Sequence, residues 1–155
     1  MPDRTYQSRH EPPWLIDRWM AHPGMATIAV WSIIAGAALL TSALVPAIIV
    51  SQAVEQFPRW LSLALSATVG SGGILATVGL LRPLRRLDTS WIIERTGWWI
   101  AGAGWASYGV AVLAEYPSSI LAWGTSLTIS VAAGSRLVAL HSIERETRLV
   151  LGRGA

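Results

Sequence analysis

Four long apolar stretches dominate the sequence and limit the folds that it can adopt. They run approximately over residues 25–50, 60–81, 96–114 and 118–140. A helix needs about 20 mostly apolar residues to cross a bilayer, and each stretch comes close to or exceeds that length. The stretches are rich in Ala, Leu and Gly and lack a period of two, which favours helices over strands. We therefore predict an all-α integral membrane protein whose four transmembrane helices form a domain over residues 25–140.

The composition agrees with a protein that is surrounded by lipid. Of the 155 residues, 52% are hydrophobic and 14% are charged, and the mean hydropathy is +0.45. A soluble domain carries about 25% charged residues, whereas a disordered chain combines low hydrophobicity with high net charge. The composition therefore argues against both classes. The absence of cysteine excludes disulfides, thiolate metal sites and a cysteine nucleophile.

The placement of arginine predicts the orientation of the helices. All 12 basic residues are arginines, and 11 of them flank the stretches on one side, with Arg59 alone on the other. Because positive residues stay on the cytoplasmic side, we expect both termini and the middle connection in the cytoplasm. These charges are too few to form a nucleic-acid-binding face. The expected charges at the cytoplasmic interface include Arg82, Arg85, Arg86, Arg95 and Arg136.

Two segments outside the membrane domain carry weaker helical patterns. In the cytoplasmic leader, residues 1–24, a helix that begins at Pro13 would gather four apolar residues on one face: Leu15, Ile16, Trp19 and Met20. This pattern is typical of an amphipathic helix lying in the membrane interface, and an unstructured leader is the alternative. In residues 141–155, Glu144 and Arg148 have the favourable i,i+4 spacing. We predict a basic helical tail in the cytoplasm there, with a docking helix as the alternative.

Small residues recur at matched positions in the two halves of the membrane domain. Small side chains spaced by four let helix backbones approach closely in lipid. The second and fourth stretches carry them in the same order and spacing, as Ser62, Ser66 and Gly70 and as Ser126, Ser130 and Gly134. The first and third stretches likewise share the run Ile-Ala-Gly-Ala, at 34–37 and at 100–103. The similar offsets predict two tandem helical hairpins related by an axis along the membrane normal, and chance similarity is the alternative.

The third stretch combines glycine with tryptophan. Trp98 and Trp105 are seven residues apart and share a helical face with Gly102 and Gly109. We predict that Gly102, Gly104 and Trp105 pack against another helix or another subunit, which would make the protein a homo-oligomer. The alternative is a ridge of tryptophans that faces lipid.

The sequence predicts no catalytic, cofactor or metal site. The run Gly-Ser-Gly-Gly at 70–73 lies within a predicted helix and lacks the lysine of a phosphate-binding loop, so we interpret it as a weak point or a close-packing site of that helix. Arg136 lies near the cytoplasmic end of its stretch, where it can extend to the interface or pair with Glu94. Deep buried charges are otherwise absent from the stretches, which argues against an ion-coupled transporter and an enzyme. Three histidines lie outside the stretches without the spacing of metal ligands: His10, His22 and His141.

A longer resemblance covers about a third of the chain. Residues 96–148 contain TGWWIAGAGWASYGVAVL, a short connection, and a stretch that ends in SRLVALHSIERETR. This segment resembles small four-span membrane proteins of actinobacterial phages, some of which are treated as holins. The resemblance implies a protein that oligomerises in the host inner membrane and permeabilises it for lysis. Holins have no active site, so no catalytic residue is transferred. The residues themselves also fit a non-catalytic accessory or assembly subunit of a larger membrane complex.

Overall fold

The computed structural model describes residues 20, 22–45, 52–81 and 87–152, and the regular elements of this part are all helices. They are α2 (Pro23–Leu44), α3 (Gln52–Glu55), α4 (Arg59–Leu81), α5 (Leu87–Glu115) and α6 (Ile120–Gly152). Three of them, α2, α4 and α6, are long and apolar enough to cross a membrane. Apart from Met20, the predicted interfacial helix of the leader lies outside the described residues.

Proline determines both ends of α2. Pro23 occupies the first turn, where the missing N–H has no helical partner to lose. Val45, which follows the last helical residue, has an extended backbone with φ −123° and ψ 90°. Val45 precedes Pro46, whose ring disfavours a helical conformation in the residue before it. The helix therefore ends at Leu44, earlier than the end near residue 50 predicted from hydropathy alone.

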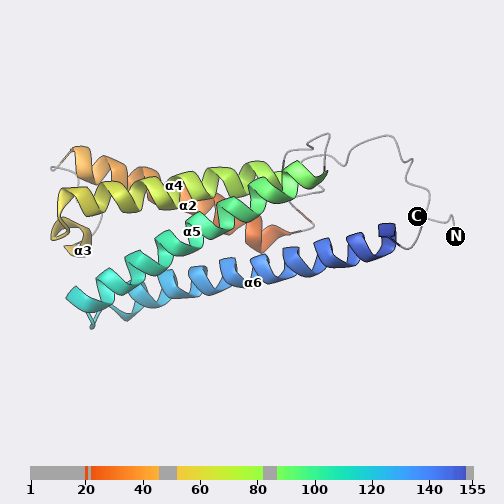
Figure 1. Cartoon of the computed structure of the whole chain (residues 1–155). Helices are drawn as coiled ribbons and strands as arrows, with labels where there is room; N and C mark the ends of the chain where they lie inside the picture. Colours follow the sequence, from red (N-terminus) through yellow and green to blue (C-terminus); the bar gives the residue numbers. More distant parts are fainter. Residues whose placement is uncertain (1–19, 21, 46–51, 82–86, 153–155) are drawn as a thin grey trace, which may run out of the picture.

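The other long helices begin or end beyond their apolar stretches. α5 begins at Leu87, nine residues before the predicted third stretch, and α6 continues for 33 residues to Gly152. At 1.5 Å per residue α6 is about 50 Å long, whereas a hydrocarbon core is about 30 Å thick. α5 is not among the helices that are apolar enough to cross a membrane. Its glycines, tryptophans and Tyr108 contribute little to hydropathy, although it lies beside the other three (Figure 1).

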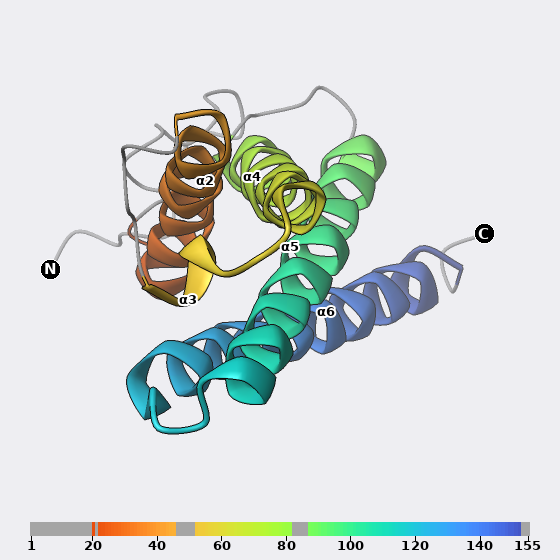
Figure 2. The ribbon, with the colours of Figure 1, turned by 90° about the vertical axis from the view of Figure 1, so that its left-hand side faces the viewer.

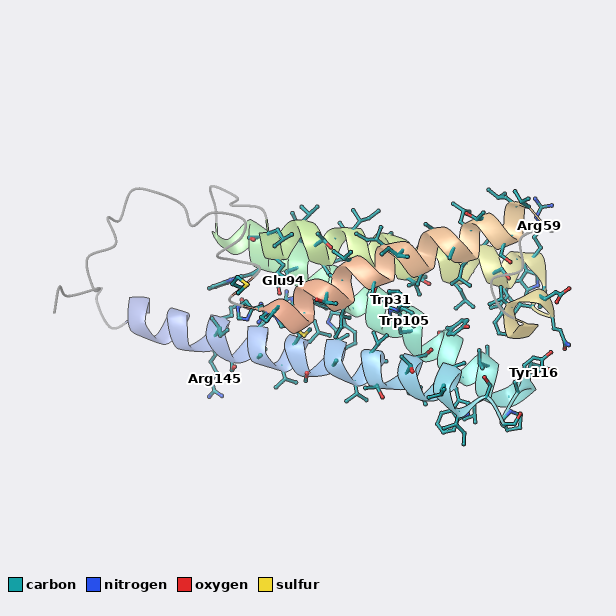
Figure 3. All side chains as sticks on the ribbon, turned by 180° about the vertical axis from the view of Figure 1, so that it is seen from behind. Trp31, Arg59, Glu94, Trp105, Tyr116 and Arg145 are labelled. Atoms are coloured by element: carbon teal, nitrogen blue, oxygen red, sulfur yellow. The ribbon has the colours of Figure 1, made fainter. Side chains whose placement is uncertain are left out.

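The long helices form two antiparallel hairpins that pack side by side (Figure 1). α4 packs on both α2 and α5, and α5 packs on both α4 and α6, so α4 and α5 are inner helices (Figure 2). Figure 3 shows Arg59 and Tyr116 near one end of the molecule and Glu94 and Arg145 toward the other, with Trp105 between. We call these the α3 end and the Glu94 end.

Aromatic side chains of α5 fill the space between the helices. Trp98 is fully buried and packs with small residues of the other three long helices, Ala29, Ala76 and Ala133. Trp105 is also buried, and its Nε1 donates a hydrogen bond of 2.9 Å to Ser32 Oγ of α2. Toward the α3 end the core continues through Leu39, Val54, Phe57, Leu65 and Val112. Both tryptophans thus lie inside the bundle, whereas their neighbour Trp99 is 64% exposed.

Candidate functional site

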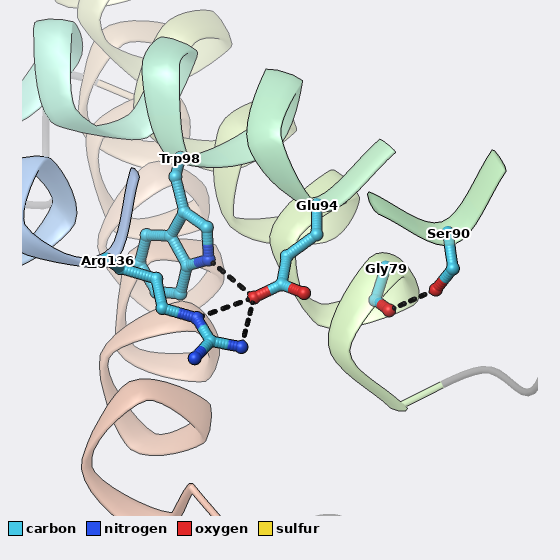
Figure 4. A network of polar contacts seen from close by, with 5 residues as sticks. All are labelled: Gly79, Ser90, Glu94, Trp98 and Arg136. Atoms are coloured by element: carbon cyan, nitrogen blue, oxygen red, sulfur yellow. Dashed lines mark hydrogen bonds and ion pairs between the residues drawn. The ribbon is translucent and has the colours of Figure 1, made fainter. Parts of the chain in front are cut away.

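A buried ion pair joins α5 to α6 at the Glu94 end. Arg136 Nε donates a hydrogen bond of 2.8 Å to Glu94 Oε1, and Arg136 Nη2 lies 2.8 Å from the same oxygen (Figure 4). Trp98 Nε1 donates a longer bond of 3.3 Å to that oxygen. The side chains of Glu94 and Arg136 are only 5% and 11% exposed. Of the two possibilities that the sequence leaves open for Arg136, the structure shows the pair with Glu94.

α4 packs closely against α5 at the backbone of Glu94. A Cβ added to Gly79 would collide with the backbone of Glu94, so only glycine permits this approach. Next to it, Ser90 Oγ donates a hydrogen bond of 2.7 Å to the Gly79 carbonyl (Figure 4). Removing one partner of a buried ion pair costs about 3–5 kcal/mol, because the other charge is left without compensation. The pair therefore holds α5 and α6 in a defined register beside α4.

Two of the predicted packing serines make equivalent hydrogen bonds between helices. Ser66 Oγ of α4 donates to the Gly36 carbonyl of α2 at 2.8 Å. Ser130 Oγ of α6 donates to the Gly102 carbonyl of α5 at 3.0 Å. In the predicted hairpin repeat, the two serines correspond to each other and so do the two glycines. The two hairpins therefore use the same contact at corresponding positions.

The other predicted packing residues lie mostly inside one chain. A Cβ added to Gly70 would lie 3.5 Å from Gly36 Cα, and one added to Gly102 would lie 3.2 Å from Ala133 Cβ. A Cβ on Gly104 would press against side chains of α4. The remaining members of this set are buried: Ser62, Trp105 and Ser126. The predicted face of the third stretch is therefore used for contacts between helices of the same chain.

Gly134 differs from the rest of the predicted set. A Cβ added to Gly134 or to Gly124 would meet no described atom within 4 Å. Three exposed side chains of small or medium size follow Gly124 on the same face of α6: Thr128, Val131 and Ser135. We call these four residues, from Gly124 to Ser135, the outer face of α6, with Gly134 at its edge. Because α6 is an edge helix, this face points away from the described helices.

Of the glycines that join α4 to α5, the sequence analysis places Gly72 in a run interpreted as a weak point or a close-packing site of its helix, and it does not single out Gly79. A Cβ added to Gly72 would collide with the backbone of Ala101, and one added to Gly97 would collide with that of Ala76. The Gly-Ser-Gly-Gly run is thus part of a close helix contact. A signal was present in the sequence. Gly72 and Gly79 are seven residues apart, as are Gly97 and Gly104, which places each pair on one helical face.

Further charges surround a hollow at the surface of the Glu94 end. It measures about 450 Å³ and is lined by Arg95, His141, Glu144 and Arg145. Arg95 Nη1 lies 3.3 Å from Glu144 Oε2, and the Arg95 side chain is 43% exposed. The other predicted interface arginines, Arg82, Arg85 and Arg86, lie outside the described residues.

Among the described residues, no group of three or more acidic, histidine or cysteine side chains is arranged to hold a metal ion. The polar features described so far are the buried ion pair and the surface hollow. Serine and glycine contacts join the helices that carry them. No protein-family model, curated protein sequence or solved structure matches this chain.

Proposed function

We propose that the protein is a non-catalytic membrane protein that associates with copies of itself and permeabilises a bacterial inner membrane, as phage holins do during host cell lysis. The observation that carries this proposal is the distribution of polarity in the bundle. Five of the described serines are buried inside it: Ser32, Ser62, Ser66, Ser90 and Ser126. Large apolar side chains such as Trp31, Ile74 and Val131 are more than half exposed.

α5 is the fourth span in this proposal. Residues 96–114 of α5 contain no charged side chain. A helical segment of that length extends about 28 Å, close to the thickness of a hydrocarbon core. The low hydropathy of α5 is tolerated because Trp98 and Trp105 face other helices rather than lipid. Four spans bring both termini to one side, and the arginines assign that side to the cytoplasm.

Separation of the helices would expose the hydroxyl groups to an aqueous path. In the closed bundle, Ser32 Oγ donates to a carbonyl of its own helix, and Ser66 Oγ donates to the neighbouring one. Hydrogen bonds between membrane helices contribute on average only about 0.6 kcal/mol each, so small contact energies separate a closed from an open arrangement. If copies replaced these contacts within a chain by contacts between chains, their hydroxyl groups would line a pore. Their apolar side chains would face lipid.

The outer face of α6 is the surface through which copies would meet. Gly124 and Thr128 are four residues apart, which is the spacing of small residues that brings membrane helices together. Because a Cβ at Gly124 would meet no described atom of the same chain, Gly124→Leu should leave the single bundle intact. It should weaken crosslinking between copies and delay growth arrest. Ile34→Leu, at an exposed position of α2, is the matched control and should change neither.

Permeabilisation is tested by inducing the unmodified protein in bacteria and following growth and the entry of a small dye. A blot of the membrane fraction shows that the protein is present. We expect abrupt growth arrest with dye entry. If the protein accumulates in the membrane while cells grow and exclude the dye, the proposal is wrong.

Topology is tested independently by reporter fusions. A fusion after Ala155 should report from the cytoplasm, and one near Gln56 should report from outside. An external signal after Ala155 would contradict the assignment of four spans with cytoplasmic ends.

A second candidate is a non-catalytic accessory subunit of a larger membrane complex. The observation that favours it is the length of α6, which extends about 20 Å beyond a hydrocarbon core about 30 Å thick. A helix of that length can reach a partner at the membrane surface. In this case cells should tolerate induction, and the protein should copurify with a larger membrane partner rather than with itself.

A further inference from the structure

The hollow at the Glu94 end combines cationic groups from two helices. α5 contributes Arg95, and α6 contributes His141, Glu144 and Arg145. We propose that this hollow binds the phosphate headgroup of an anionic phospholipid. The inference rests on the membrane orientation proposed above, with the Glu94 end at the cytoplasmic surface, and is independent of permeabilisation.

The position of the hollow along α6 fits the depth of lipid headgroups. α6 begins at Ile120, and His141 lies in its second half. At 1.5 Å per residue, the rise from Ile120 to His141 is about 32 Å, just beyond a hydrocarbon core of about 30 Å. Arg145 lies one further turn along the helix. The lining residues therefore stand where phosphates of the cytoplasmic leaflet are found.

The donors in the hollow fit a phosphate. Arg95 donates a hydrogen bond of 3.3 Å to Glu144 Oε2, and a guanidinium has five N–H donors. Glu144 thus holds the Arg95 side chain while further donors of the guanidinium can reach an oxyanion. Arg145 lines the hollow and is exposed, with its side chain extending outward from α6 (Figure 3), and a histidine can donate in either charge state. Two arginines against one glutamate leave an excess of one positive charge.

Apolar side chains on the membrane side of the hollow fit the acyl chains of a lipid. Trp99 is four residues after Arg95 on α5 and therefore lies on the same helical face, displaced toward the membrane centre. On α6, Val138 precedes His141 by three residues and Arg145 by seven. It therefore lies on the same helical face as both and closer to the membrane centre. Trp99 and Val138 are 64% and 72% exposed. A polar hollow beside an apolar strip matches a phospholipid better than a free phosphate.

The test uses the full-length purified protein in detergent. Native mass spectrometry follows lipid retention during titration with phosphatidylglycerol or with phosphatidylcholine, and inorganic phosphate is added as a competitor. We expect phosphatidylglycerol to be retained in preference to phosphatidylcholine. Arg145→Gln should weaken that retention about fivefold, the effect of one arginine at a membrane surface. Glu144→Gln, which removes the opposing charge, should strengthen it.

Arg59→Gln is the matched control, because it removes the same charge from the α3 end (Figure 3). It should leave the retention of phosphatidylglycerol unchanged. Equal loss in Arg59→Gln and Arg145→Gln, or equal retention of the two lipids, would overturn the proposal. Displacement of the lipid by millimolar inorganic phosphate would assign the site to free phosphate and overturn its assignment to lipid. None of these measurements depends on growth arrest or dye entry, so this proposal and the proposed function can fail separately.

Discussion

The hairpin of α2 and α4 and the hairpin of α5 and α6 use the same side-chain positions in different surroundings. In both, a serine hydroxyl of the second helix donates to a glycine carbonyl of the first, through Ser66 and Ser130. Four buried positions of α4 also recur as buried positions of α6, at the same offset that relates these two serines. They are Ser62, Leu65, Val69 and Ala76, and then Ser126, Ile129, Ala133 and Leu140.

The hairpins differ because α4 is an inner helix of the bundle, whereas α6 lies at its edge. Arg136 of α6 corresponds, at that offset, to Gly72 of α4. Position 72 has no room for a side chain because α5 crosses α4 there, whereas the corresponding position of α6 has room for an arginine that reaches Glu94. Gly70 faces Gly36, while its counterpart Gly134 faces away from the described helices. The position of a helix in the bundle therefore determines which members of a repeated pattern are used for packing.

The largest expected effect concerns the ion pair between Glu94 and Arg136 in the second hairpin. Glu94→Ala should destabilise the bundle by about 3 kcal/mol, because Arg136 would be left buried without its partner. Unfolding in a denaturing detergent, followed by circular dichroism, measures this loss. The double variant Glu94→Gln with Arg136→Gln should lose less than the sum of the two single variants. Additive losses would show that the two charges do not depend on each other.

A smaller effect is expected from equivalent glycines of the two hairpins. A Cβ at Gly36 would lie 2.5 Å from Gly70 Cα, whereas one at Gly102 would lie 3.2 Å from Ala133 Cβ. Gly36→Ala should therefore cost about 2 kcal/mol, and Gly102→Ala less than about 1 kcal/mol. The same unfolding measurement compares them. A larger loss in Gly102→Ala would mean that the first hairpin is not the tighter one.

The smallest effect is expected from the two equivalent serines. Ser66→Ala and Ser130→Ala should each cost about 0.5–1 kcal/mol, the usual contribution of a hydrogen bond between membrane helices. Ser66 is buried and Ser130 is half-buried, so the loss should be greater at Ser66. Thr41→Val, at an exposed position of α2, serves as a control, since the Thr41 hydroxyl donates to a carbonyl of its own helix. If the control lost as much stability as Ser66→Ala, the loss in Ser66→Ala could not be assigned to its interhelical hydrogen bond.

Hydropathy predicts most of the helical architecture. The second stretch, predicted over 60–81, coincides within one residue with α4, because apolar length is a local property of the chain. The first stretch extends past α2 in the prediction, because hydropathy does not register the effect of Pro46 on Val45. α5 is helical over the third stretch, but it is not among the helices that are apolar enough to cross a membrane. Trp98 and Trp105 reflect packing inside the bundle, whereas Trp99 is exposed.

The polar contacts are less accessible to sequence analysis. Pairing of Glu94 with Arg136 is one of two possibilities that the sequence offers, and helix register decides between them. The bond from Trp105 to Ser32 joins residues 73 positions apart, and no local pattern links them. The matched serines and glycines are predictable as packing residues because small side chains at regular spacing have a defined meaning in lipid. Which helix each one faces depends on the order of helices in the bundle.

Under the proposed function, the buried tryptophans of α5 would affect the kinetics of membrane permeabilisation. Trp98 and Trp105 are buried and fill the space between the long helices of a single copy. Under the proposed function, leakage would begin only when several copies meet, so its onset would scale with a high power of surface density. A small increase in synthesis rate would then advance lysis sharply, in the manner of a nucleated transition. Each cell would keep its membrane potential until the critical density was reached.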